Sequence, residues 1–92
     1  MRIRGEGLTR KVWINDHLLS PERSQKLVNH SPDGFNWGYG GSGPSQLALA
    51  ICLLIYPEQK ALLVYQDFKR EVISSLPLDE DFEIDLDESM LV

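Results

Sequence analysis

The chain has 92 residues and a mass of 10.5 kDa, which is enough for one domain, residues 1–92, and too little for two. Apolar residues make up 42% of it and charged residues 25%, so it can form a core and is not a disordered polymer. The longest apolar run, residues 47–56, is roughly half as long as a membrane-spanning helix. Because the chain starts without an apolar leader segment and its single cysteine cannot form an internal disulfide, we expect a soluble cytoplasmic protein.

The net charge of −5 is unevenly distributed along the chain. Residues 1–78 carry nine basic and seven acidic side chains, whereas no Lys or Arg follows Arg70. An acidic end on a near-neutral body argues against binding to duplex nucleic acid, which requires clustered cations. The acidic segment is therefore either a solvated strand and tail or a surface for a partner with a basic groove. Its acidic members are Asp79, Glu80, Asp81, Glu83, Asp85, Asp87 and Glu88.

The first elements in chain order, within residues 1–19, are predicted to form a β-hairpin. A β-branched and aromatic run at residues 11–14 is followed by Asn15 and Asp16, which supply turn chemistry. A single helical turn over about residues 21–25 comes next, because a serine and a proline stand at its start.

The next segment, residues 29–46, is rich in glycine and aromatic residues and is predicted to be a structured loop. Residues 31–34 read Ser-Pro-Asp-Gly, which fits a β-turn. Three aromatic residues then stand at alternate positions, so their rings are expected on one face, packed against the core. They are Phe35, Trp37 and Tyr39.

Two helices are predicted after the loop. Pro44 is expected at the first helical position, with Gly43 or Ser42 as the cap, and residues 44–56 form a helix that is apolar on every side and therefore buried. Pro57 ends that helix and begins an amphipathic one over residues 57–76. The inward positions of the second helix are Ala61, Tyr65, Phe68, Val72 and Leu76.

The acidic segment, residues 79–92, alternates apolar and charged residues and is predicted to supply an edge strand, whose charges oppose aggregation. The predicted fold class is α+β: a small antiparallel β-sheet, made of the N-terminal hairpin and the C-terminal strand, packed against two antiparallel α-helices.

Glycines before the first long helix are the first candidate for chemistry. Gly38, Gly40 and Gly43 match the spacing G-x-G-x-x-G, but a dinucleotide-binding unit needs a second parallel strand, and here another helix follows. A P-loop is excluded because Pro44 occupies the position of its lysine. Two interpretations remain open: the turn holds an anion at the helix N-terminus, or its glycines only allow close packing.

Catalytic and metal motifs are incomplete. His30 and Asp33 are close in sequence, but no partnered nucleophile is identifiable, so His30 is better explained as a turn-stabilising group. Neither H-E-x-x-H nor C-x-x-C is present, and Cys52 lies in the apolar helix as a core residue. We therefore expect no metal and no cofactor.

Two stretches, NHSPDGFNWGYGGSGPSQLALAICLL and YQDFKREVISSLP, resemble a family of small uncharacterised single-domain proteins of prokaryotes and their phages. The resemblance covers roughly residues 10–78. The chain departs from the family pattern at Cys52, where an aliphatic residue is usual, and in the acidic segment. It implies that six residues share one surface: His30, Asp33, Trp37, Tyr39, Gln46 and Lys69.

Three functions are considered. The first is a non-enzymatic binding protein that captures a small anionic, nucleotide-like ligand at the glycine-rich helix start. In a phage or mobile element it would be an accessory factor. The second is an acidic inhibitor or adaptor of the anti-CRISPR kind, which uses the acidic segment against a basic host protein. The third is a small enzyme based on His30 and Asp33. The candidate ligand residues are Gly40, Gly41, Ser42, Gly43, Gln46, His30, Asp33, Trp37, Tyr39 and Lys69.

Overall fold

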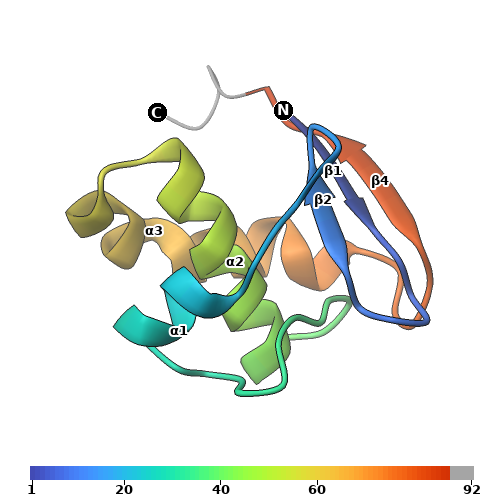
Figure 1. Cartoon of the computed structure of the whole chain (residues 1–92), viewed down its shortest axis with the longest axis horizontal. Coiled ribbons are helices and arrows are strands. Elements are labelled where there is room, and N and C mark those ends of the chain that lie inside the picture. Colours follow the sequence, from blue (N-terminus) through green and yellow to red (C-terminus); the bar gives the residue numbers. More distant parts are fainter. Residues whose placement is uncertain (88–92) are drawn as a thin grey trace.

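A computed structural model describes residues 1–87 of the chain and has the predicted α+β architecture (Figure 1). Residue Glu88 of the acidic segment, with the remainder of the predicted tail, lies outside the described residues. The elements are β1 (Arg2–Gly5), β2 (Val12–Ile14), β3 (His17–Leu18), α1 (Glu22–Leu27), α2 (Ser42–Ile55), α3 (Glu58–Glu71), the 3₁₀ turn η1 (Ile73–Ser75) and β4 (Phe82–Asp85).

The predicted hairpin is confirmed as β2 and β3. Its two-residue turn consists of Asn15 and Asp16, with φ angles of 48° and 68°. Both residues tolerate the left-handed region better than most, and this turn geometry matches the twist of the flanking strands. The turn fixes the register, which pairs Trp13 with Leu18.

The sheet is antiparallel in the order β3-β2-β1-β4, so the first strand is central and the last strand lies at an edge, as expected for the acidic segment. Beyond β4 the pairing continues for one more residue, because the Leu86 N–H donates to the Met1 carbonyl at 2.8 Å.

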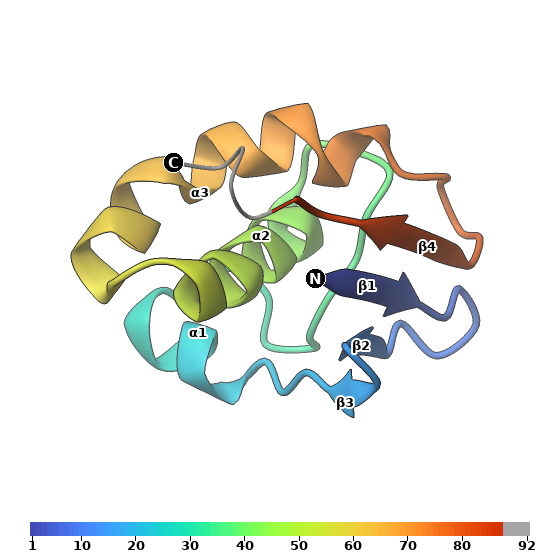
Figure 2. The same cartoon turned by 90° about the horizontal axis from the view of Figure 1, so that it is seen from above.

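The core lies between the sheet and the helices. Inner-face residues such as Ile3 and Val12 are fully buried in one cluster with the residues of α2. Residues 43–53 of α2 are all buried, which confirms the prediction from its uniformly apolar sequence. Figure 2 shows α2 in the centre of the molecule, with α3 running roughly opposite to it after the turn at Pro57. Each large aliphatic side chain of α2 that is buried in this way contributes about 1.5–3 kcal/mol.

Helix α2 begins two residues before the predicted start. Its N-cap is Gly41, and Pro44 is the third helical residue. Proline is accepted anywhere in the first turn because the N–H it lacks has no intrahelical partner there. The first helical bond instead runs from the Ser45 N–H to the Gly41 carbonyl at 3.1 Å.

Helix α3 ends earlier than the predicted residue 76. After Glu71 the chain tightens into the turn η1. The hydroxyl of Ser74 donates to the Arg70 carbonyl at 2.8 Å, and that of Ser75 to the Glu71 carbonyl at 3.4 Å. Serine hydroxyls that take up the last carbonyls in this way compete with helix continuation. The predicted inward residue Leu76 is still buried, outside the helix.

The aromatic alternation of the loop holds for two residues only. Phe35 and Trp37 are buried, whereas Tyr39 is 41% exposed, which contradicts the prediction that all three rings pack on the core. Gly38 lies between Trp37 and Tyr39, has a φ of +84° and bends the chain. An extended alternation cannot continue through that conformation.

Candidate functional site

The start of α2 forms an exposed corner of the molecule, which we call the α2 corner and define as residues 39–43 together with Lys69. No side chain caps the helix at Gly41, and its first turn contains no acidic residue. The first N–H groups of a helix have no intrahelical partner, and of those in the first turn of α2 the one at Ser42 belongs to an exposed residue, whereas Gly43 is buried. The positive end of the α2 dipole thus reaches the surface without an internal counter-charge.

Lys69 comes to this corner from the last turn of α3. Its Nζ lies 3.5 Å from the Gly40 carbonyl oxygen. Tyr39 is beside it, and its hydroxyl accepts a bond of 3.3 Å from the Asn36 side-chain amide. The structure therefore brings six of the ten candidate ligand residues close together: Tyr39, Gly40, Gly41, Ser42, Gly43 and Lys69.

Two glycines of the turn have a packing role. A Cβ at Gly38 would lie 2.6 Å from the Leu78 Cα, and one at Gly43 would lie 2.5 Å from the Asn36 Cβ. At Gly41 the nearest atom belongs to the outer part of the exposed Tyr39 ring, which can move aside. At Gly40 a Cβ would meet no atom of the described residues within 4 Å. Packing thus explains Gly38 and Gly43 and leaves room for a side chain at Gly40.

Gln46 belongs to the core of the molecule and not to the α2 corner. Its side chain is fully buried. Its Oε1 accepts bonds from the N–H groups of His30 at 2.8 Å and Ser31 at 3.0 Å. Its Nε2 donates to the Ser24 hydroxyl at 2.8 Å and to the Val28 carbonyl at 3.1 Å. No hydrogen-bonding group is left for a ligand, which corrects the prediction that Gln46 binds one.

Trp37 is also removed from the candidate site. Its side chain is fully buried, and its indole Nε1 donates to the Glu80 carbonyl at 3.0 Å. The ring stacks edge-on against Phe82 with 4.8 Å between the centroids. Its role is to attach β4 and the preceding loop to the core.

His30 and Asp33 do not form a pair. His30 lies against α3, where its Nε2 is 2.9 Å from the Tyr65 hydroxyl. Asp33 is exposed and lines a cavity with residues of the hairpin, and His30 does not line that cavity. The six residues expected on one surface are therefore separated. Trp37 and Gln46 lie in the core, Tyr39 and Lys69 at the α2 corner, His30 against α3, and Asp33 beside the hairpin.

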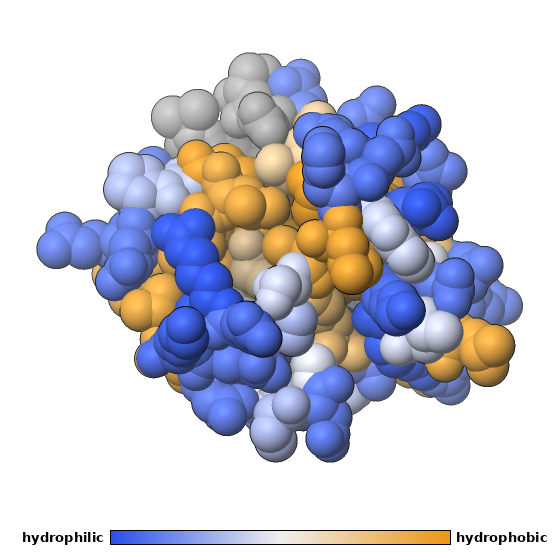
Figure 3. Space-filling model, viewed as in Figure 1, coloured by the Kyte–Doolittle hydropathy of each residue, from blue (hydrophilic) through white to orange (hydrophobic). Residues whose placement is uncertain are grey.

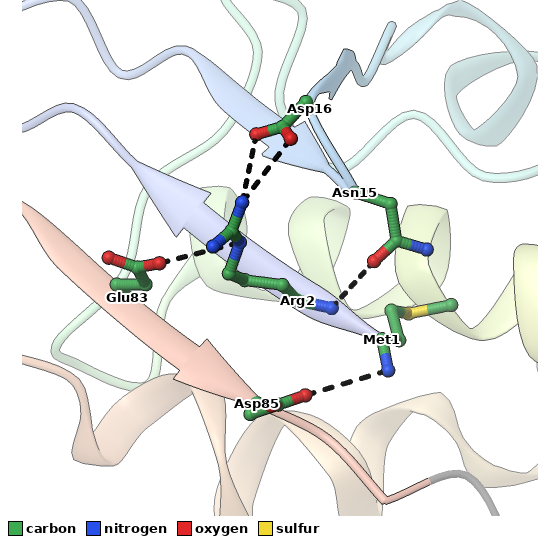
Figure 4. Close-up of polar contacts among 6 residues, drawn as sticks. All are labelled: Met1, Arg2, Asn15, Asp16, Glu83 and Asp85. Carbon is green, nitrogen blue, oxygen red and sulfur yellow. Dashed lines mark hydrogen bonds and ion pairs between the residues drawn. The ribbon is translucent and has the colours of Figure 1, made fainter.

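Several acidic residues near β4 form ion pairs or hydrogen bonds with other residues of the same chain, although their side chains are exposed. Asp79 pairs with Arg10, and the Asp81 carboxylate accepts the Gly7 N–H at 2.6 Å. Figure 4 shows Glu83 beside Arg2, at 3.4 Å, and Asp85 beside the Met1 ammonium, at 3.6 Å. These contacts join the acidic segment to the basic start of the chain and offset part of its charge. Partner binding by Asp79, Glu80, Asp81, Glu83, Asp85, Asp87 and Glu88 stays a prediction.

Cys52 is fully buried, as predicted. Burial disfavours the thiolate and raises its pKa to about 12. Within residues 1–87, no group of three or more His, Cys, Asp or Glu side chains could hold a metal ion. In that same range no helix has both the length and the apolar character needed to cross a bilayer.

A groove beside β3 was not predicted from the sequence. Leu18 and Leu54 are 60% and 49% exposed, and both line it. They come from elements far apart in the chain, so only the fold reveals their proximity. The available signal in the sequence was the uninterrupted apolar run of α2. Because this helix has no polar face, any side chain that the core leaves uncovered is an apolar side chain exposed to solvent.

The chain matches a known protein family over most of its length. DUF6166, a family of unknown function, covers residues 3–90. No curated protein and no solved structure matches the chain.

Proposed function

The chain belongs to DUF6166, a family of unknown function, and we propose that it is a non-enzymatic binding protein that captures a small anionic, nucleotide-like ligand at the α2 corner. In a phage or another mobile element, such a protein would act as an accessory factor that sequesters a nucleotide signal. The observation that carries the proposal is the Lys69 ammonium beside the uncapped start of α2.

The electrostatics of the corner favour an anion. Helix α2, which is 14 residues long, begins at this corner. The unpaired N–H groups of its first turn are together equivalent to about half a positive charge. Lys69 adds a full positive charge, and Ser42 is exposed with a hydroxyl that can donate. The Lys69 ammonium also retains donors beyond the one near Gly40, since it carries three.

The space at Gly40 supports the same proposal. A ligand oxygen must approach the backbone closely to accept from N–H groups, and a side chain at this position would obstruct it. Because no atom of residues 1–87 lies within 4 Å of a Cβ placed there, packing among these residues gives no reason for glycine at this position.

The test is a thermal shift assay with inorganic phosphate, pyrophosphate and a panel of mono- and dinucleotides. Ligand at one hundred times its Kd stabilises the folded state by about 2.7 kcal/mol, which raises the Tm of a domain this small by roughly 10 °C or more. Lys69→Gln and Ser42→Asp should each abolish the shift. Asp is favourable in the first helical turn, so Ser42→Asp should leave the Tm of the free protein nearly unchanged.

The matched control is Lys60→Gln, which removes an exposed lysine from the first turn of the same helix α3. It should preserve the shift. If no phosphate compound moves the melting curve of the unmodified protein at millimolar concentration, the α2 corner does not bind such an anion and the proposal fails.

A second candidate function is supported by the exposure of the acidic edge. The side chains of Asp79 and Asp85 are 70% and 86% exposed, so their carboxylates can contact a basic partner without leaving their present positions. We propose this as the alternative, an adaptor or inhibitor of a basic host protein. Its binding should weaken as salt rises, because exposed charges are screened, and salt-independent binding would eliminate it.

A further inference from the structure

Three cavities lie next to one another along β3 and share lining residues. Their volumes are about 340, 270 and 180 Å³. Leu19 lines all three, Leu18 lines the first two, and Leu54 lines the first and third. We call this surface the β3 groove. It lies against the C-terminal half of α2, at the other end of that helix from the α2 corner.

The floor of the groove is apolar. Leu53 and Ala50 of α2 line it from below and are nearly fully buried, whereas Leu54 and Leu18 are about half exposed. Figure 3 shows hydrophobic residues gathered in a hollow at the centre of this face, with hydrophilic residues around them. A concave apolar surface with a polar rim is the usual form of an interaction site.

One side of the groove is the free edge of the sheet. The Leu19 N–H donates to the Val12 carbonyl at 2.8 Å, so Leu19 faces β2 with its backbone groups. In an antiparallel ladder the preceding residue, Leu18, then points its N–H and C=O away from β2. No strand pairs with this edge among the described residues. An added strand would be held there by main-chain hydrogen bonds, and its alternate side chains would enter the groove.

The charge of the rim selects among extended partners. Lys11 and Arg10 line the second cavity and Arg23 lines the third, against one acidic residue, Asp33. Arg10 is already paired with Asp79, which leaves Lys11 and Arg23 as the cations that face a partner. The Arg23 guanidinium is fixed by a bond of 3.2 Å to the Leu53 carbonyl and retains further N–H donors. This basic rim contrasts with a chain whose net charge is −5.

We propose that the β3 groove binds an extended segment of a partner protein in which apolar side chains alternate with acidic ones, and that this segment adds to the sheet beside β3. The apolar side chains enter the groove beside Leu19 and Leu54, on the face of the sheet that α2 covers, and the carboxylates meet the cations of the rim, Arg23 and Lys11. A nucleic acid has phosphates for the rim but no apolar side chains for the floor, so it fits less well.

The test measures fluorescence anisotropy of a labelled peptide with three Asp-Leu repeats. Two peptides serve as probes of the chemistry: one with Lys in place of Asp, and one with Ser in place of Leu. The Asp-Leu peptide should bind at least about tenfold more tightly than either, and its binding should weaken with salt.

Variants of the protein locate the site. Leu54→Ser removes an anchor from the floor and should weaken binding about tenfold or more. Arg23→Gln should lower the affinity for the Asp-Leu peptide. The difference in affinity between this peptide and the one with Lys in place of Asp should therefore become smaller. The matched control is Leu63→Ser, since Leu63 is 80% exposed on α3 and does not line the groove. It should bind as the unmodified protein does, and thermal melting of each variant confirms that it is folded.

Three results would overturn the proposal. The first is absence of binding by every peptide at 1 mM protein, roughly the weak limit of specific association. The second is equal loss of binding in Leu54→Ser and Leu63→Ser, because it would place the peptide elsewhere. The third is a dimer in sedimentation that Leu54→Ser dissociates, which would assign the groove to a second copy of the chain. None of these measurements involves the α2 corner, so this proposal and the proposed function succeed or fail separately.

Discussion

Replacement of the buried Gln46 by leucine should be the most damaging single change of a polar residue. The leucine keeps a similar volume but loses four hydrogen bonds, to His30, Ser31, Ser24 and Val28. Some of the abandoned groups have other partners, because the His30 N–H also reaches the Val28 carbonyl at 3.2 Å and the Ser24 hydroxyl donates to the Pro21 carbonyl at 2.8 Å. At roughly 1 kcal/mol for each hydrogen bond lost, and more for a group left unpaired, the expected loss is about 3 kcal/mol.

That loss is large for a domain of this size. Total stability is about 5–14 kcal/mol at the usual value for each residue, and 3 kcal/mol corresponds to a fall in Tm of roughly 12–24 °C. Urea unfolding followed by the fluorescence of the buried Trp37 measures the change directly. The control Gln59→Leu alters an exposed glutamine on α3 and should change stability by less than about 0.5 kcal/mol. A loss below about 1 kcal/mol in Gln46→Leu would refute the assignment of Gln46 as the polar link between α2 and the end of α1.

Gly38→Ala should destabilise by about 2 kcal/mol or more, because φ is +84° and the Cβ would strike the Leu78 backbone, whereas Gly40→Ala should be nearly neutral; comparable urea midpoints for the two variants would contradict this. The Cys52 thiol should react with a disulfide reagent at pH 8 only as fast as the protein unfolds. Its folded pKa of about 12 exceeds the unfolded value of about 8.5, so the associated stability is complete below pH 8.5 and is lost as the pH rises toward 12; Cys52→Ala should remove that part of the pH dependence in urea titrations. Asp81→Ala should cost about 1 kcal/mol through the lost bond to the Gly7 N–H, while Asp81→Asn retains an acceptor and should cost less; equal midpoints would show that the bond contributes nothing.

Local sequence signals predicted the elements well. The Asn15-Asp16 turn, the buried α2 and the break at Pro57 each depend on a few neighbouring residues whose backbone preferences are strong. The start of α2 was misplaced because a proline fits any position of the first turn, so Pro44 alone does not identify the cap. The alternation of aromatic residues failed at Tyr39 for a similar reason, since it assumes an extended chain and Gly38 is not extended.

The candidate site was predictable only in part, because Lys69 was expected at the surface through the family resemblance and not from its place in the chain. The glycine turn and Lys69 do meet, but the sequence could not distinguish Gln46 from a surface residue, because its four partners come from α1 and the loop after it. The charge count likewise treated the acidic segment as free. The partners Arg2, Arg10 and the Met1 ammonium lie at the opposite end of the sequence, and pairing between the first and last strands is what brings them together.

The central position of β1 has a consequence for how the chain folds during synthesis. Strand β1 can pair with β2 soon after both leave the ribosome, but its second neighbour, β4, is made only after the three helices. Until residues 82–85 emerge, β1 exposes an open edge, and the core lacks Phe82, which packs on Trp37. Pairings of such long sequence separation form slowly, and open strand edges invite association with other chains. The nascent protein should therefore be most prone to aggregate in the interval between completion of α3 and arrival of the final strand.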